Sequence, residues 1–462
     1  MLTSRTRSSL GLAAFATTAA LVLTGCSGEA AGEPQKPEAV DTAAPVTITI
    51  GEKPTSDQEA ALKALDDQVA KFQDLYPNIT VKTEETRYDA STFGPLLVGG
   101  TAPTTVGIPF TDMNALIERG QAADITDYIE KGSILSGLNP TLQDVVTQDG
   151  RQYGVVRQAY SMALIYNRAL YTQAGLDPDK VPTTWEGILQ NAQTITEKTG
   201  KTGFIIPTTG NQGGWLLTTM SYANGSLVEK TEGEKTEVTI DTDAMAASLQ
   251  FLHDLRWKAN AAGANFLLGG DDIRNELGAG NIGQTINGGS IYGDLVINRG
   301  MDGADVGIAP LPQGSDGLGA LGGGTIQWFN PKATPEELAA ALKWTEFQWM
   351  NKYVDEEAAV SAAQAVKADN RPVGAPELPL IDEASYETYL GWIKDEINVD
   401  RGAYSAYIDS TLAVVPEPAA KAQELYAALD PIVQAVLTDE KADIAKLLTD
   451  AQSAVQSIVD AG

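Results

Sequence analysis

The segment VTITIGEKPTSDQEAALKALDDQVAKFQDLYPNITVKTEE, residues 46–85, contains a complete strand–helix–strand pattern. β-Branched residues alternate in VTITI (46–50) and again in ITVKTE (79–84), which is typical of strands. Between these two runs, apolar residues recur at helical spacing from Leu62 to Phe72. Two strands joined through a helix pair in parallel, with a right-handed crossover. The segment therefore predicts an α/β fold.

The same alternation of strands and helices continues along the chain. Ser56 is a predicted N-cap, and Glu59 would complete its capping box. Further helices are predicted at Met113–Glu118, Trp185–Thr199, 243–259, 270–279, 334–350 and 382–393, with a helical pair from 417 to 459. Further strands are predicted at 153–156, 161–167, 203–207, 282–286 and 306–310.

Composition limits the classes of function. The chain has 462 residues, which suits two lobes, and its 61 acidic against 32 basic residues give a formal net charge of −29. Such a surface repels phosphate backbones, so nucleic acid is excluded as a partner. One cysteine cannot form an internal disulfide, and with His253 the only histidine no Cys/His cluster exists for a metal. No cofactor is expected.

The N-terminus predicts export and lipidation. A basic start at Arg5 precedes the apolar run Leu10–Leu23, which is too short to span a bilayer and reads as a secretory signal. The run ends in LTGC, which resembles the lipobox of bacterial lipoproteins and implies lipidation of Cys26. We therefore expect a signal peptide at 1–25, a flexible tether at 26–45, and a protein anchored on the outer side of the cell membrane.

Several later segments, taken together and in order, resemble the family 1 extracellular solute-binding proteins of ABC importers. The most specific is DGRQYGVVRQAYSMALIYNRALYTQAGLDP (149–178), followed by VPTTWEGIL (181–189). GQTINGGSIYG (283–293) and GALGGGTIQWF (319–329) are similar to the family's later strands and loops. TAPTTV (101–106) departs from the family pattern, because the aspartate expected there is missing.

This resemblance implies a two-lobed fold of the type II periplasmic-binding-protein (venus-flytrap) kind. Lobe one would be 46–156 plus 325–375, and lobe two 157–324 plus 376–462, with the chain crossing a hinge between them. The implied function is capture of a sugar or oligosaccharide in the interlobe cleft and its delivery to the permease subunits of an ABC transporter. The resemblance implies a monomeric binding protein and not an enzyme.

Sugar recognition needs flat aromatic surfaces together with paired hydrogen-bond donors and acceptors. The resemblance places eleven residues at the ligand: Phe110, Asp112, Tyr160, Gln212, Trp215, Asn287, Gly289, Tyr292, Gly323, Tyr404 and Tyr407. We expect Trp215 in an exposed loop that follows the strand GFIIP (203–207). Trp185, Trp344 and Trp349 read as packing residues instead.

Several alternatives stay open at this point. Asp112 could instead be the N-cap of a helix that begins near Met113. Relatives commonly carry a stacking tryptophan where this chain has Ser290, so either Tyr292 compensates, the sugar sits differently, or the ligand is not a maltodextrin. GLGALG (317–322) satisfies a dinucleotide-binding pattern, but a strand follows it where a helix is needed, so a hinge loop is favoured. A peptide or polyamine binder on the same fold, or a secreted glycoside hydrolase, remains a competing function.

Overall fold

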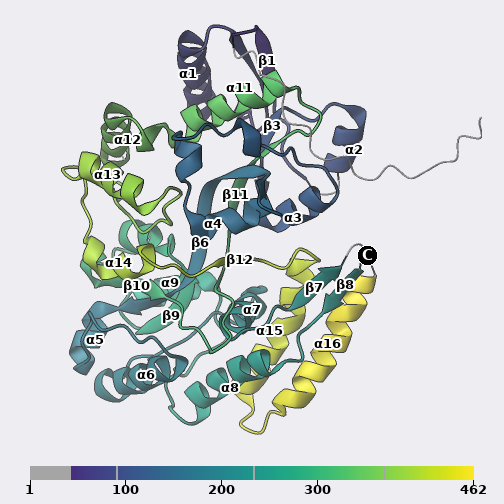
Figure 1. The fold of residues 1–462 in the computed structure, drawn as a ribbon. Helices are drawn as coiled ribbons and strands as arrows, with labels where there is room; N and C mark the ends of the chain where they lie inside the picture. The colour runs from purple at the N-terminus through teal and green to yellow at the C-terminus, as the bar shows by residue number, and fades with distance from the viewer. Residues whose placement is uncertain (1–42, 90–91, 233–234, 369, 462) are drawn as a thin grey trace, which may run out of the picture. The chain divides into compact units, whose positions relative to one another are not determined.

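The structure is a computed structural model that describes residues 43–89, 92–232, 235–368 and 370–461. The predicted signal peptide, Cys26 and all but the end of the predicted tether lie outside the described residues. The prediction of a mixed α/β fold is confirmed (Figure 1).

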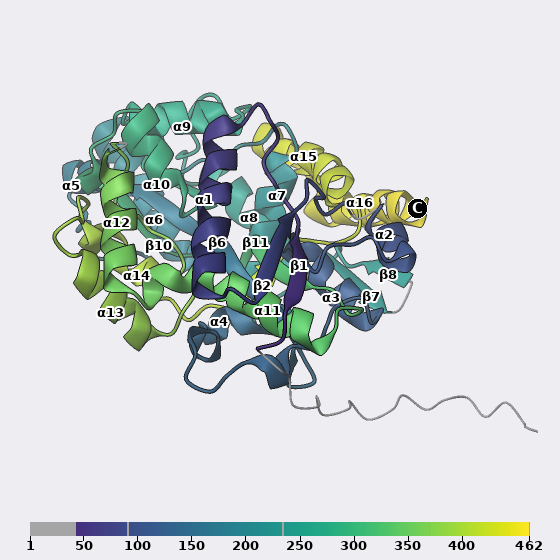
Figure 2. The ribbon, with the colours of Figure 1, turned by 90° about the horizontal axis from the view of Figure 1, so that it is seen from above.

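The opening strand–helix–strand pattern forms as the sequence predicts. β1 (Val46–Ile50) pairs in parallel with β2 (Ile79–Thr83) along its whole length. On its other edge β1 meets β3 (Thr105–Pro109), also in parallel. α1 (Glu59–Leu75) and α11 (Pro335–Thr345) lie on the same side of β1, because their side chains share a core with it (Figure 2).

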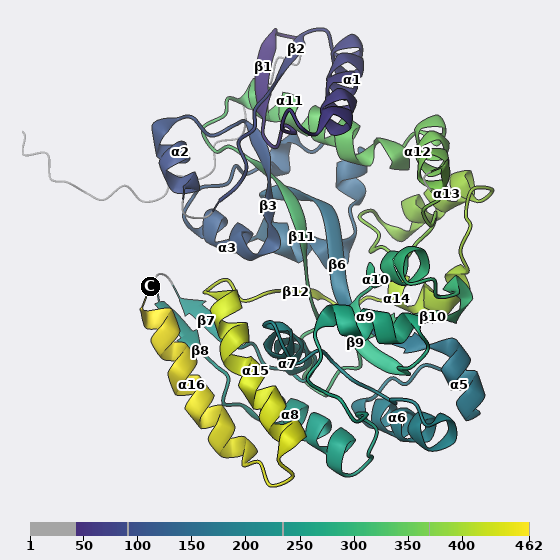
Figure 3. The same ribbon diagram turned by 180° about the vertical axis from the view of Figure 1, so that it is seen from behind.

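Two long strands connect this parallel group to a second group of strands. The two strands predicted at 153–156 and 161–167 are one 14-residue strand, β6 (Gly154–Asn167). Its first half pairs antiparallel with β11 (Ala320–Phe329), which in turn pairs antiparallel with β3. Its second half pairs antiparallel with β9 (Gln284–Gly288) and β10 (Val306–Pro310). β6 therefore runs from one strand group into the other (Figure 3).

The remaining elements are mostly helices that cover these strands. The helices are α2 (Phe93–Gly99), α3 (Phe110–Glu118), α4 (Pro140–Gln143), α5 (Arg168–Ala174), α6 (Trp185–Thr199), α7 (Gln212–Ala223), α8 (Asp243–Trp257), α9 (Gly270–Gly278), α10 (Ile291–Gly293), α12 (Glu356–Ala368), α13 (Glu383–Ile393), α14 (Ser405–Ile408), α15 (Ala422–Thr438) and α16 (Ile444–Asp460). The short strands are β4 (Thr147–Gln148), β5 (Arg151–Gln152), β7 (Glu229–Glu232), β8 (Lys235–Val238) and β12 (Val414–Pro416), the last of which pairs in parallel with the start of β11.

Each strand group packs against helices, and one further buried cluster contains side chains of both groups, from β3 and β11 to β10. Phe72 of α1 and Trp344 of α11 are fully buried and meet edge to face, with ring centroids 5.1 Å apart. Around the second group, side chains of α7, α8 and α15 pack with the far half of β6. Trp328 of β11 is also fully buried, and its indole N–H donates to the carbonyl of Gln121.

Two local predictions are wrong. Ser56 does not cap α1: the amide of Gln58 donates to the Thr55 carbonyl, so a turn precedes the helix, which begins at Glu59 without a side-chain cap. GFIIP (203–207) is not a strand. The Ile205 amide donates to the Gln284 carbonyl of β9, but the amides of its first two residues donate to the carbonyl of Ala261, in a loop, so no regular ladder forms.

Candidate functional site

A candidate site lies where the parallel strand group changes direction. From β1 the chain passes through α1 to β2 on one side and then returns to β3 on the other side. This arrangement makes a topological switch point at the carboxyl end of β1, where α/β sheets place their ligand sites. The loop that begins there at Gly51 is fixed, since the amide of Gly51 donates to the Thr105 carbonyl and that of Glu52 to the Thr86 carbonyl.

Glu52 has an unusual backbone conformation. Its φ is +65°, in the left-handed region that residues with a side chain seldom adopt. Two flanking backbone hydrogen bonds, from Glu52 to Thr86 and from Lys53 to Glu84, hold it there. Strain of this kind, about 1–3 kcal/mol, clusters at functional sites. In this conformation the Glu52 carboxylate accepts a hydrogen bond from the Gly107 amide of β3.

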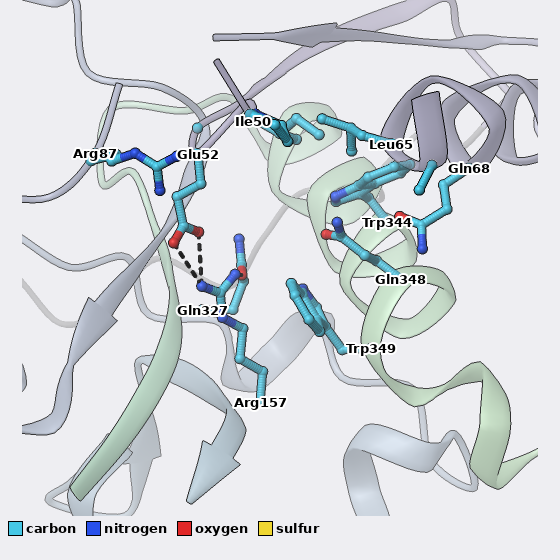
Figure 4. Close-up of a pocket in the computed structure, with 13 residues that line it drawn as sticks. Ile50, Glu52, Leu65, Gln68, Arg87, Arg157, Gln327, Trp344, Gln348 and Trp349 are labelled. Carbon is cyan, nitrogen blue, oxygen red and sulfur yellow. Dashed lines mark hydrogen bonds and ion pairs between the residues drawn. The ribbon is translucent and has the colours of Figure 1, made fainter. Parts of the chain in front are cut away.

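A cavity of about 350 Å³ opens beside this loop (Figure 4). It is lined by Ile50, Gly51, Glu52, Pro54, Ala64, Leu65, Gln68, Arg87, Arg157, Gln327, Trp344, Gln348 and Trp349. Figure 4 shows Arg87 beside Glu52 on one side, Arg157 and Gln327 at the base, and the two tryptophans with Gln348 on the other side. We call this cavity the switch-point pocket.

Arg157 and Glu52 form a partly buried ion pair at the base of the pocket, with the Glu52 side chain 27% exposed. Nη2 of Arg157 lies 2.8 Å from the Glu52 carboxylate, and Nη1 donates to Oε1 of Gln327 at 2.9 Å. The amide of Gly107 also donates to Glu52, at 3.0 Å. The Arg157 side chain is only 10% exposed, and this burial lowers its pKa, while the Glu52 carboxylate opposes the shift. A side chain at Gly107 would overlap the guanidinium, so the pair requires glycine there.

The opposite wall of the pocket is aromatic. The Arg157 guanidinium carbon lies 4.4 Å from the centroid of the Trp349 ring, a stacked cation–π contact. The indole N–H groups of Trp344 and Trp349 are buried and have no hydrogen-bond partner within the described residues. The ring of Trp349, beside two arginines, a carboxylate and three glutamines, forms a surface suited to a ligand with an apolar face and several hydroxyl groups.

Two of the predicted site residues, Tyr160 and Gly323, meet at the crossing strands. Tyr160 of β6 lies opposite Gly323 of β11, and its ring covers that glycine. The Tyr160 hydroxyl donates to Glu417 at 2.8 Å, and the Tyr426 hydroxyl donates to the other oxygen of the same carboxylate at 3.0 Å. Burial, and then the Glu417 charge, raise the pKa of Tyr160, so this hydroxyl stays protonated. Asn287, in β9 opposite Ala163, is half-buried.

The three other predicted tyrosines are buried. Tyr407 packs against Gly289, and its hydroxyl donates to the Ser161 carbonyl at 3.2 Å. Tyr292 and Tyr404 meet edge to face with centroids 5.4 Å apart. Because each is at most 2% exposed, their rings act as packing groups in this structure, and contact with a ligand stays a prediction for them.

Phe110 and Asp112 lie in α3, which begins earlier than predicted. The helix starts at Phe110, directly after β3, with Pro109 as its N-cap. The alternative that Asp112 caps a helix beginning near Met113 is therefore wrong, and Asp112 lies in the first turn. It accepts a hydrogen bond from Thr111 at 3.0 Å. The ring of Phe110 is buried next to Gly324 of β11.

Trp215 and Gln212 are in α7 and not in an exposed loop. Gln212 begins the helix and packs against Gly270. Trp215 is half-buried against the core of the second strand group, and its indole N–H has no partner within the described residues. The prediction of a loop here is wrong because Gly213 and Gly214 pack closely under α15 and allow the helix to start.

Replacing Trp215 with alanine should lower the free energy of unfolding by about 2 kcal/mol, less than the 3–5 kcal/mol typical of a fully buried tryptophan. Chemical denaturation followed by circular dichroism measures this. Trp215→Phe should recover most of the loss, because it keeps an aromatic ring in the same packing. A Trp215→Ala protein as stable as the wild type would contradict this placement.

Sequence reasoning missed the residues that form the switch-point pocket. Both tryptophans line the cavity, but Trp344 is fully buried, as the sequence predicts, whereas Trp349 is partly exposed. The sequence contains one signal for Arg157, because this charged residue interrupts the predicted strand in GVVRQAY (154–160). Glu52 gave no comparable signal. Within the described residues, no group of three or more His, Cys, Asp or Glu side chains is arranged to hold a metal ion.

Glu229 of β7 supports the segment that follows Glu417. Its Oε1 accepts the amide hydrogens of Ala419 and Ala420 at 2.7 and 3.0 Å, while Oε2 is buried with no partner within the described residues. Burial raises the pKa of Glu229, and the two backbone hydrogen bonds oppose this shift. A carboxyl group whose pKa is higher in the folded state contributes stability that is present at low pH and lost as the pH rises through that value.

We therefore expect Glu229→Gln to be more stable than the wild type above the folded-state pKa of Glu229. The difference should disappear below the ordinary pKa of a glutamate, because the wild-type group is then protonated in both states. Thermal melts across pH 4–8 measure it, with the exposed Glu237→Gln as a control. A stability difference that is constant with pH would show that ionisation of Glu229 is not the cause.

Comparison with known proteins gives one family match and several similar structures. A model of the bacterial extracellular solute-binding protein family matches residues 54–348. An arabinooligosaccharide-binding protein of Halalkalibacterium halodurans is 23% identical over 196 residues, which are 41% of this chain and 42% of that protein. The match thus spans less than half the length of this curated relative.

Two solved structures illustrate the likeness in fold. The cyclic alpha-maltosyl-1,6-maltose binding protein from Arthrobacter globiformis has a TM-score of 0.64 at 21% identity, over 91% of this chain and 100% of that one. UgpB from Mycobacterium tuberculosis, in complex with glycerophosphocholine, has a TM-score of 0.59 at 19% identity, over 90% and 98% of the two chains. At these identities the likeness shows the fold alone.

Proposed function

Because the chain belongs to the bacterial extracellular solute-binding protein family, we propose that it captures a sugar or oligosaccharide and passes it to an ABC permease. The observation that carries the sugar assignment is the switch-point pocket, where Trp349 offers a ring face beside Arg157, Glu52 and glutamine amides. Hydroxyl pairs of a sugar bind such planar polar groups, while its C–H face stacks on the indole.

The predicted lobes belong to this proposal. Lobe one (46–156 plus 325–375) and lobe two (157–324 plus 376–462) would close on the ligand about the crossing strands, with the protein acting as a monomer. The register of β6 supports a hinge in this region, since its first half pairs with β11 and its second half pairs with β9 and β10. The other predicted site residues, from Phe110 to Tyr407, would then contribute contacts on closing.

A non-sugar solute is the second candidate. UgpB, which shares the fold, is in complex with glycerophosphocholine, so the fold does not fix the ligand. The family is one of binding proteins, and we propose that this chain has no catalytic activity and needs no cofactor.

A thermal-shift panel separates the two candidates. Binding to the native state alone raises stability by RT ln(1 + [L]/Kd), about 2.7 kcal/mol at 100 times Kd. We expect arabino- or maltooligosaccharides to raise the melting temperature, and glycerophosphocholine and amino acids to leave it unchanged. A higher melting temperature with the non-sugar compounds alone would show that the solute is not a sugar.

We also propose that Cys26 carries a lipid anchor, which would hold the protein outside the cytoplasm beside its permease. Two features support this: the LTGC site, and the small polar residues that follow it up to β1. Among residues 43–89, 92–232, 235–368 and 370–461, no helix has the length and apolarity needed to cross a membrane.

Replacing Cys26 with serine should abolish lipidation, so that the protein partitions into the aqueous phase of a detergent extraction or is released from the cells. Binding of solute should be unchanged, because the site lies in the folded part of the chain. Retention of the variant in the detergent phase would disprove the anchor.

A further inference from the structure

A chain of buried hydrogen bonds runs from the base of the switch-point pocket into the sheet. Nε2 of Gln327 donates to Oγ1 of Thr105 at 2.6 Å, and the Thr105 hydroxyl donates to the Trp328 carbonyl at 2.7 Å. At the other end of the Gln327 side chain, Oε1 accepts from Arg157 at 2.9 Å. Gln327 is only 3% exposed and Thr105 is fully buried, so solvent has little access to these bonds.

The two ends of this chain fix the direction of every bond in it. A guanidinium only donates, so Oε1 of Gln327 must face Arg157 and Nε2 must face Thr105. A backbone carbonyl only accepts, so the Thr105 hydroxyl must direct its hydrogen to Trp328 and a lone pair to Gln327. The Gln327 amide therefore has one favourable orientation, and Thr105 anchors it there.

Thr105 also fixes the loop on the other side of Arg157. Its backbone carbonyl accepts the amide hydrogen of Gly51 at 3.0 Å, where the loop that carries Glu52 begins. Arg157 bonds to both Glu52 and Gln327, so each of its two partners is held through Thr105. Thr105 does not line the pocket, and an effect of its side chain on binding would therefore be indirect.

The Arg157 guanidinium keeps hydrogen-bond donors for a solute. A guanidinium has five N–H groups. The contacts of Arg157 with the two Glu52 oxygens and with Gln327 use at most three of these groups. Its side chain lines the pocket and is 10% exposed. A charge-assisted hydrogen bond to a solute requires that this group keep its orientation, because such bonds weaken steeply as their geometry departs from linear.

From this arrangement we propose that Thr105 is a positioning residue for solute binding. Through Gln327 it holds the Arg157 guanidinium in the orientation in which a remaining N–H group donates to a hydroxyl oxygen of the sugar. This inference rests on the proposed function, because it concerns the affinity of the switch-point pocket for its solute.

Calorimetric titration of Thr105 variants tests the inference, with the saccharide that gives the largest thermal shift as the probe. Thr105→Val has nearly the same shape but lacks the hydroxyl, and we expect it to weaken binding by about 10-fold. Thr105→Ser keeps the hydroxyl and should bind as the wild type does, although the lost methyl group lowers its stability. If the valine variant does not fold, Thr105→Ala is compared with Thr105→Ser, because both lose the methyl group and only the alanine variant lacks the hydroxyl.

Two further variants separate positioning from a general effect on the fold. Thr104→Val is the matched control, because the buried Thr104 side chain bonds to Thr49 and neither residue lines the pocket. It should lower stability and leave affinity unchanged. In a protein that already carries Arg157→Met, Thr105→Val should cause no further loss of affinity, because the threonine acts through the arginine.

Three results would overturn the positioning role while leaving sugar capture in place. They are wild-type affinity in the folded Thr105→Val protein, an equal loss of affinity in Thr104→Val, and an undiminished effect of Thr105→Val in the Arg157→Met background. Absence of binding by every saccharide to the wild type would overturn the proposed function itself.

Discussion

Replacing Glu52 with alanine is expected to lower the free energy of unfolding by about 3 kcal/mol, because it leaves the Arg157 guanidinium buried without its counter-charge. Arg157 is 10% exposed and would keep only Gln327 as a hydrogen-bond partner and the face of Trp349 as a contact. The amide of Gly107 would also lose its acceptor. Urea denaturation of the wild type and the variant measures the difference.

Two controls separate the ion pair from a general loss of charge. Adding Arg157→Met to Glu52→Ala should recover part of the stability, since no uncompensated charge then remains. Asp67→Ala breaks an exposed ion pair, in which the Lys63 side chain is 75% exposed and the Asp67 side chain 58%. This change should lower the free energy of unfolding by less than about 1 kcal/mol. A Glu52→Ala protein no less stable than Asp67→Ala would show that the Glu52–Arg157 pair does not stabilise the fold.

Replacing Trp349 with alanine should weaken sugar binding by about 10- to 100-fold, which corresponds to about 1.4–2.8 kcal/mol. The indole supplies the ring face of the switch-point pocket and holds the Arg157 guanidinium at 4.4 Å. Its removal would take away the stacking surface and loosen the cation beside it. Calorimetric titration gives the change in affinity.

Phe347→Ala is the matched control for this change. Phe347 lies two residues earlier and packs against Phe72, with centroids 5.4 Å apart; it contacts Trp344 but does not itself line the pocket. Its removal should lower stability and leave affinity unchanged. If the two variants lost affinity equally, the effect of Trp349 would come from folding and not from contact with the ligand.

Local patterns predicted most helices and strands well, because the residues that form each of them are neighbours in the sequence. The alternation in VTITI, the helical spacing that follows it and the second strand at Ile79 form one unit of β1, α1 and β2. The predicted helix Trp185–Thr199 has the same bounds in the structure. The patterns failed where contacts between distant segments determine the local structure. GFIIP has strand composition and lies beside β9, but its first amides donate to a loop carbonyl and no regular ladder forms. Ser56 could cap a helix but is displaced from it by a turn.

The pocket could not be predicted because its members are far apart in the sequence. Glu52 and Arg157 are 105 positions apart and meet only because β1, β3, β11 and β6 are neighbours in that order. Trp349 comes from a third region, and its helical pattern resembles that of the buried Trp344. The site residues predicted from the family resemblance do not line this pocket. Tyr160 and Gly323 lie together at the crossing strands, whereas Tyr292, Tyr404 and Tyr407 are buried.

The central claim is that this protein binds a sugar through the switch-point pocket. Its most direct test is calorimetric titration of the wild-type protein and of Trp349→Ala with the saccharide that gives the largest thermal shift. The account predicts saturable one-site binding to the wild type and an affinity at least 10-fold lower for a variant that is still folded. Equal affinities of the two folded proteins, or no saccharide binding to the wild type, would contradict it.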